Sequence, residues 1–200
     1  MKRVLVTGFE PYGGHAHNPS EAVARLLDGI EIGGAEVAGR VLPVIHAGLA
    51  ARIEALIDES APRAVICLGL DPGEAAIRLE RVAANVLDFE IADNAGAVLR
   101  GPIVADADDM LRSTLPLAAI ERDLKAASLP VRCSDDAGRF VCNALMYHAL
   151  SAANRRRPAP VCGFIHLPFL PEQAAHHASL PLASMAEAVR IAIRATLEAA

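Results

Sequence analysis

Short apolar runs rich in β-branched residues alternate along this chain with segments whose apolar residues recur at helical spacing. The runs are nearly continuous in apolar character, and each is long enough for one buried strand. Buried strands separated by helices are typical of a sheet that is covered by helices on both faces. The pattern therefore predicts an α/β fold, a three-layer α/β/α sandwich around a mixed, mostly parallel sheet. The expected strands are residues 3–7, 35–42, 64–68, 131–133 and 161–167.

The segments between these runs predict four helices. Asn18 can cap a helix that starts at Pro19, because its side chain accepts from free amide groups and proline suits the first helical position. A helix from Ser184 has Glu187 three residues later, the spacing of a capping box. Two further helices are expected at about 46–59 and 140–154. Residues 77–84 predict one extra strand, with Arg78 and Glu80 on its polar side.

Composition limits what the chain binds and where it works. With 200 residues, 53% of them hydrophobic and no linker-like tract, the sequence predicts one domain over residues 1–200. A net charge of -5 and a single basic cluster at Arg155–Arg157 argue against nucleic-acid partners. No apolar stretch is long enough to span a membrane, and the first residues lack the pattern of a signal peptide. We therefore expect a cytoplasmic protein with no membrane partner.

Of the four cysteines, one lies where thiol chemistry is favoured. Without a Cys-x-x-Cys motif and in a reducing compartment, a cysteine is ordinarily a small buried hydrophobe. Cys142 follows a turn that opens a helix, where free amide groups and the helix dipole favour a thiolate. From its position alone, Cys142 is equally well explained as a buried structural cysteine. The other three are Cys67, Cys133 and Cys162.

Two further side chains can complete a thiol-based site. His166 ends the last expected strand; a lone histidine there is ordinarily a satisfied core residue, but a cysteine peptidase needs such a base. A third group must orient the imidazole, and Glu80 is the candidate. Its alternative role is a surface carboxylate paired with Arg78 or Arg81. The remaining histidines show no metal-ligand spacing, so no metal site is expected.

A glycine-containing loop follows the first expected strand, at residues 7–14. Its spacing fits neither G-x-G-x-x-G nor a phosphate-binding loop with its lysine. Phe9 and Tyr12 in this loop favour a small apolar pocket, because aromatic side chains at the end of a strand often line one. The alternative is a rigid surface turn. The roles of Glu10 and Asn18 beside the pocket stay open, although Asn18 suits a helix cap.

Four segments together resemble the pyroglutamyl peptidase I family of cysteine peptidases, in the order and at the spacing of that family. They span nearly the whole chain, and their combination is highly specific although no one of them is. They are residues 6–14 with 18–20, residues 80–83 with Asn85, residues 137–138 with 140–143, and residues 163–168 with 171–173.

The resemblance implies a function and a set of site residues. Cys142 is the expected nucleophile, His166 the base and then the acid, and Glu80 the group that orients the imidazole. The expected reaction removes an N-terminal pyroglutamyl residue from peptides through a thioacyl-enzyme, without a cofactor. The resemblance also implies a phosphorylase/hydrolase-like fold and a homo-oligomer, a dimer or a tetramer. The expected substrate pocket consists of Phe9, Tyr12, Leu70, Ile91, Phe140 and Val141.

Three departures from the family pattern surround this expected site. Residues 70–74 replace the usual Gln-Ala-Gly-Gly-Arg, and Pro72 puts the path of that loop in doubt. Glu90 stands where the family usually has an arginine, which would disfavour a nearby thiolate and weaken oxyanion support. Asp135 and Asp136 replace Asn-Thr. The departures leave two alternatives open: a thiol hydrolase of another lactam or small N-acyl amide, and a binding homologue with weakened catalysis.

Overall fold

The computed structural model describes residues 2–199 and is organised around a seven-stranded sheet with the order β10-β5-β11-β4-β1-β3-β2. Neighbouring strands run parallel except for β5 with β11 and β2 with β3, which are antiparallel. The sheet is therefore mixed and mostly parallel, as expected. The strands are β1 (Lys2–Phe9), β2 (Glu31–Ile32), β3 (Ala35–Leu42), β4 (Ala64–Leu70), β5 (Ile77–Glu80), β10 (Val131–Ser134) and β11 (Val161–Leu167).

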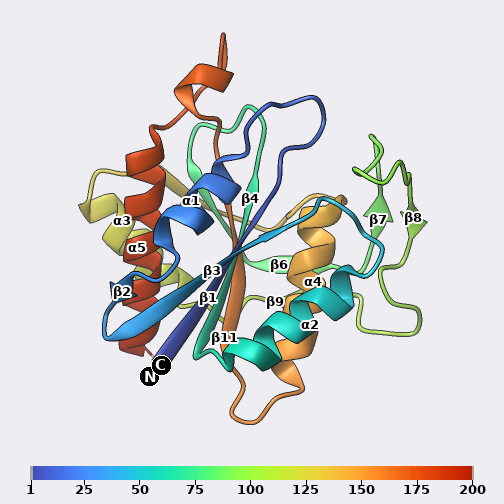
Figure 1. Cartoon of the computed structure of the whole chain (residues 1–200), viewed down its shortest axis with the longest axis horizontal. Helices are drawn as coiled ribbons and strands as arrows, with labels where there is room; N and C mark the ends of the chain where they lie inside the picture. The colour runs from blue at the N-terminus through green and yellow to red at the C-terminus, as the bar shows by residue number, and fades with distance from the viewer. Residues whose placement is uncertain (1, 200) are drawn as a thin grey trace.

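Helices cover both faces of the sheet (Figure 1). One apolar core joins the sheet to α1, α3 and α5, and a second core joins its other face to α2 and α4. This arrangement confirms the three-layer α/β/α sandwich. The helices are α1 (Pro19–Leu27), α2 (Leu49–Ser60), α3 (Leu117–Ala126), α4 (Val141–Asn154) and α5 (Leu182–Ala199), with a 3-10 turn η1 (Pro171–Gln173).

The expected strand at 77–84 is wrong as a single element. Its first half is β5 in the main sheet, and its second half is β6 (Val82–Ala84), which pairs with β9 (Met110–Arg112). The break falls at Arg81, whose amide donates to Ser134 and whose carbonyl accepts from Ser113, so the chain leaves the main sheet there. The sequence analysis also missed a second small pair, β7 (Leu87–Asp88) with β8 (Arg100–Gly101), and the helix α3.

Helix ends follow local hydrogen bonds more than sequence pattern. Asn18 caps α1 as expected, accepting from the amide of Ser20. Helix α2 begins at Leu49 rather than near residue 46, because Gly48 adopts the left-handed region with φ 74°. Helix α5 begins before Ser184, since the amide of Ser184 already donates to the carbonyl of Pro181.

Two glycines let α1 lie unusually close to the sheet. A Cβ on Gly8 would come within 2.1 Å of the carbonyl oxygen of Ser20, and one on Gly39 within 2.1 Å of that of Ala24. Any side chain at either position would push α1 off β1 and β3. The loop between β1 and α1, which carries Tyr12, is therefore fixed at both of its ends. None of the helices between residues 2 and 199 is long and apolar enough to span a bilayer.

Truncating one central leucine should cost far more stability than truncating one on the surface. Leu5 on β1 is 0% exposed, whereas Leu26 on α1 is 48% exposed. Leu5→Ala leaves a cavity and should lower the free energy of unfolding by about 2–5 kcal/mol, while Leu26→Ala should change it by less than about 1 kcal/mol. Urea unfolding followed by circular dichroism measures both. Equal losses in the two variants would contradict the burial of Leu5 in the core.

Candidate active site

The carboxyl ends of β4 and β11 and the first turn of α4 meet at one edge of the sheet. His166 lies opposite Gly69 in the parallel β4–β11 pair and opposite Arg78 in the antiparallel β5–β11 pair. Cys142 is the second residue of α4. Cys142 lies 62 residues after Glu80 in the chain, and His166 lies 24 residues after Cys142. Strand register and helix packing bring these three side chains together.

Gly69 provides the space for the sulfur atom. A Cβ built on Gly69 would lie 2.8 Å from Sγ of Cys142 and 2.8 Å from the ring of Phe164. The sulfur therefore rests directly over the β4 backbone, beside the strand neighbour that carries His166. Cys142 and His166 line a common pocket of about 380 Å³, and Cys142 is 8% exposed. A side chain at residue 69 would displace the sulfur.

His166 is held by a buried carboxylate. Its Nδ1 atom lies 2.8 Å from Oε1 of Glu80, which is completely buried on β5. The alternative of a surface carboxylate is wrong, because Glu80 has no exposure, although the same Oε1 atom does accept from Nε of Arg78 at 2.8 Å. The buried carboxylate is therefore paired with an arginine and also bonded to the imidazole.

The charges of this group favour a protonated imidazole. Burial lowers the pKa of His166, but hydrogen bonds and negative charge from Cys142 and Glu80 outweigh burial and raise this pKa to about 9. Burial also raises the pKa of Glu80, yet the hydrogen bond and charge of His166 and the charge of Arg78 leave it below its ordinary value. The site is therefore arranged to hold an imidazolium next to a carboxylate at neutral pH.

Aromatic side chains form the wall next to the thiol. Tyr12 and Phe140 line the pocket with Leu70, and their ring centroids lie 5.7 Å apart. Phe89 supports Phe140 from behind in an edge contact with centroids 4.5 Å apart. Burial, with the charges of Cys142 and Asp71, raises the pKa of Tyr12, so this wall stays uncharged. Such a surface suits a small neutral group.

Comparison with known proteins identifies the family of this fold and site. A family model described as pyroglutamyl peptidase matches residues 2–199. The chain belongs to the pyroglutamyl peptidase family. It is 40% identical to the pyrrolidone-carboxylate peptidase of Pyrococcus furiosus, across 98% of both chains, and 44% identical to that of Cupriavidus pinatubonensis, across 98% of this chain and 94% of the relative.

Solved structures show the same likeness. A mutant pyrrolidone carboxyl peptidase from Pyrococcus furiosus superposes with a TM-score of 0.95 at 40% identity, covering 98% of this chain and 99% of that one. Membership in this family makes the chain a cysteine-type hydrolase that acts on peptides. The resemblance drawn from the four sequence segments is confirmed, and so is the fold class.

The other residues expected in a pyroglutamyl pocket lie at different depths. Ile91 is 46% exposed and lines an adjoining hollow of about 530 Å³, which shares Tyr12 and Phe140 with the pocket of Cys142. Phe9 and Val141 are each only 1% exposed and pack into the core behind the site. Of these expected pocket residues, Ile91 therefore lies at the surface of the adjoining hollow, whereas Phe9 and Val141 support the site from the core.

Glu90 does not line the pocket of Cys142 in this structure. Its exposed side chain borders the adjoining hollow, together with Asp88, Asp136 and Arg139. Asp135 is held by Arg81, and Asp136 accepts from the amide of Gly138 within its turn. Glu90 thus lies at the adjoining hollow, whereas Asp136 also lines the pocket of Cys142.

Glu10 and Asn18 tie down the loop that carries Tyr12. Asn18 donates to the carbonyl of Glu10 while its oxygen caps α1. The Glu10 carboxylate accepts from the amide of Val44 and from the side chain of Asn94. These bonds connect the loop to α1, to the end of β3 and to the segment after β7. Both side chains therefore have structural partners.

Sequence reasoning overlooked Asn143 as a residue that fixes the nucleophile. Asn143 is completely buried, accepts from the amide of Ala84 and donates to the carbonyls of Ala84 and Val86. It thereby fastens the first turn of α4 to β6, one residue after Cys142. The available signal was an amide side chain within an otherwise apolar helical stretch. Within residues 2–199, no group of three or more His, Cys, Asp or Glu side chains could hold a metal ion.

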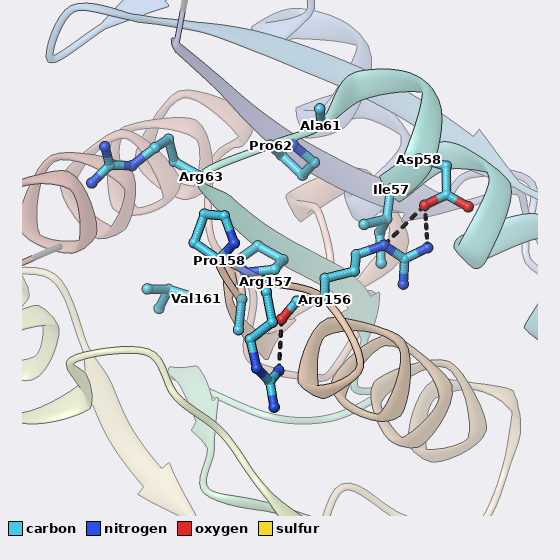
Figure 2. A pocket seen from close by; sticks show the side chains of 11 residues that line it. Ile57, Asp58, Ala61, Pro62, Arg63, Arg156, Arg157, Pro158 and Val161 are labelled. Atoms are coloured by element: carbon cyan, nitrogen blue, oxygen red, sulfur yellow. Dashed lines mark hydrogen bonds and ion pairs between the residues drawn. The ribbon is translucent and has the colours of Figure 1, made fainter.

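A second large hollow lies at the opposite edge of the sheet, at the end of α4 (Figure 2). Two residues of the basic cluster noted in the sequence, Arg156 and Arg157, line it. Arg156 donates to the carbonyl of Ala152 and pairs with Asp58, and Arg157 donates to the carbonyl of Asn154. Basic side chains at a helix C-terminus satisfy its free carbonyls and its dipole. The cluster therefore stabilises the end of α4 and its contact with α2.

Stability should fall as the imidazolium loses its proton. The pKa of His166 is about 9 in the folded chain, above the ordinary 6.5, so the protonated ring stabilises the fold fully below about pH 6.5. This contribution should disappear as pH rises through about 9. Urea unfolding of the native chain and of His166→Gln between pH 6 and pH 10 measures the difference. A difference that stays constant with pH would contradict the raised pKa.

Proposed function

We propose that this chain removes an N-terminal pyroglutamyl residue from peptides, with Cys142 as the nucleophile. The observation that carries the proposal is the convergence of Cys142, His166 and Glu80 at one edge of the sheet, beside an uncharged aromatic wall. Family membership supports the removal of pyroglutamate. The geometry of this chain supports the role of each of the three side chains.

The reaction proceeds in two stages. The thiolate of Cys142 attacks the carbonyl carbon that follows the lactam ring, and His166 carries the thiol proton as an imidazolium. His166 gives this proton to the departing amine as the C–N bond breaks, which leaves a thioacyl-enzyme. His166 then takes a proton from water, whose oxygen attacks the thioester carbon. Cleavage of the C–S bond releases pyroglutamate and returns the proton to sulfur. Glu80 holds the ring in place throughout.

The start of α4 supplies donors for the charge that develops on oxygen. Helix α4 begins after Phe140, whose side chain makes no capping hydrogen bond. The first amide groups of a helix have no partner within the helix, and here no side chain replaces that partner. These groups point to the same edge as the thiol and suit an oxyanion. A polar cap such as serine would compete for them.

The pocket wall explains how a blocked terminus is selected. The lactam ring is small and uncharged, so Tyr12, Phe140 and Leu70 can cover it without stranding a charge. A free amino terminus would lose its hydration against the same surface. The two carboxylates that line this pocket are already engaged, Asp71 by Arg78 and Asp136 by the amide of Gly138. Discrimination against the charged terminus therefore follows from desolvation.

Compartment and assembly are part of the proposal. We propose a cytoplasmic enzyme that forms a dimer or a tetramer. The four free cysteines suit a reducing compartment. Exposed apolar side chains, among them Val98 and Met110 at more than half of their full exposure, offer surface for contacts between copies.

Hydrolysis of a fluorogenic pyroglutamyl amide tests the function. The purified chain should release the fluorophore, and Cys142→Ala should abolish the release while the circular dichroism spectrum stays unchanged. A panel of other N-acyl amides runs alongside, because residues 70–74 and Glu90 depart from the family pattern near the approach to the thiol. Faster turnover of another lactam or acyl amide would replace the proposed substrate. Full activity of Cys142→Ala would eliminate the mechanism.

Glu80→Gln tests the orienting role of the carboxylate. It keeps the shape but removes the charge that helps to raise the pKa of His166 to about 9. We expect kcat/KM to fall on the order of 10²–10⁴-fold and the alkaline limb of its pH profile to move to lower pH. Glu74→Gln is the control, since Glu74 pairs with Arg132 instead of His166. Similar losses in both variants would refute the assignment.

A further inference from the structure

Arg78 connects three parts of the site that are distant in sequence. Its Nε atom donates to Oε1 of Glu80 at 2.8 Å, one Nη atom donates to Asp71 at 2.6 Å, and the other donates to the carbonyl of Asp136 at 2.6 Å. The side chain is only 15% exposed. The planar guanidinium can hold all three acceptors at once, which an ammonium group cannot do in this geometry.

Each of the three acceptors belongs to a segment that shapes the reactive centre. Glu80 is bonded to His166, and the carbonyl of Asp136 lies in the turn that leads to Cys142. Asp71 begins the loop that departs from the family pattern, and its amide donates to Leu167 at the end of β11. Fixing one guanidinium therefore fixes the orienting carboxylate, the turn before the nucleophile and the loop after β4 relative to one another.

Arg78 also competes with His166 for a single oxygen atom. Oε1 of Glu80 accepts from Nε of Arg78 and lies at the same 2.8 Å from Nδ1 of His166. Two cations on one buried carboxylate oxygen each reduce the attraction available to the other. Asp71 counteracts this competition, because it draws the guanidinium toward its own carboxylate. The balance between Arg78 and Asp71 thus acts on the imidazolium.

No other described pair of charged groups around His166 acts on Glu80 as Arg78 and Asp71 do. Only Arg78 bonds both to Glu80 and to a second carboxylate among the described contacts. Arg132 is committed to Glu74. The charged and titratable groups that face His166 are Cys142 on α4, Glu80 and Arg78 on β5, Arg132 on β10, Asp71 after β4, Asp136 in the turn before α4, and Tyr12 in the loop after β1.

We propose that Arg78 is a positioning residue of the reactive centre, and that the Arg78–Asp71 pair sets how strongly Glu80 holds the protonated imidazole of His166. This inference rests on the proposed function for its turnover readout but not for its chemistry. The inference also gives Asp71 a role. This residue departs from the family pattern, forms an ion pair with Arg78, and through Arg78 acts on the protonated imidazole.

The pH dependence of kcat/KM in single variants distinguishes this role from a structural one. Arg78→Met removes a cation next to the imidazolium and should move the alkaline limb to higher pH by roughly half a unit or more. Asp71→Asn removes an anion and should move the same limb to lower pH. Both should lower kcat/KM, by roughly 10-fold or more for Arg78→Met because the three segments lose their common anchor.

Three further variants complete the design. Arg78→Lys keeps the charge and should keep the limb near its original pH, while kcat/KM stays reduced because one ammonium nitrogen cannot reach all three acceptors in this geometry. The double variant Arg78→Met with Asp71→Asn should return the limb toward its original position. Arg81→Met is the matched control, since Arg81 follows Glu80 directly but pairs with the exposed Asp135; it should leave the pH profile unchanged.

The outcomes separate this inference from the proposed function. If the native chain hydrolyses pyroglutamyl amides but the limb shifts in the same direction in both single variants, or in neither, the inference is wrong. If the native chain hydrolyses none, the proposed function fails, and the rate of Cys142 alkylation by iodoacetamide across pH replaces turnover. The alkylation rate changes at high pH, where the imidazolium loses its proton. This step should move to higher pH in Arg78→Met and to lower pH in Asp71→Asn. If Arg78→Met does not fold, the other two single variants test the inference: Asp71→Asn should move the limb to lower pH, and Arg78→Lys should leave it near its original pH.

Discussion

The hydrogen bond between Glu80 and His166 is the interaction on which the arrangement of the site depends. It requires a carboxylate with no solvent exposure, which a fold tolerates only when that charge is paired and hydrogen-bonded. The antiparallel pairing of β5 with β11, within an otherwise mostly parallel sheet, is what places the two side chains together. A parallel β5 would reverse the strand and carry Glu80 to a different position along β11.

The nucleophile depends on close packing more than on charge. Gly69 leaves room for the sulfur above β4, and Gly8 and Gly39 let α1 approach the sheet so that the adjoining loop is held firmly. Asn143 fastens the start of α4 to β6. A side chain at residue 69 would displace the sulfur, and loss of the Asn143 hydrogen bonds would release the helix turn that carries it.

The departures from the family pattern are integrated into this packing. Asp71 and Glu74, in the loop after β4, are paired with Arg78 and Arg132 on two neighbouring strands. Glu90 borders the adjoining hollow instead of the thiol pocket. The loop is therefore anchored by ion pairs to two strands of the sheet, and Asp71 lies in the same pocket as His166.

The sequence by itself determined the alternation of strands and helices, the cap at Asn18, and the segments that carry Cys142, His166 and Glu80. Apolar periodicity and local capping depend on neighbours in the chain, so they can be read without coordinates. Only the tertiary structure decided that residues 77–84 divide between two sheets, that helix α3 exists, and that Arg78 shares an oxygen with His166. Those features arise from strand order and register, which bring together residues whose separation in the sequence contains no information about their contact.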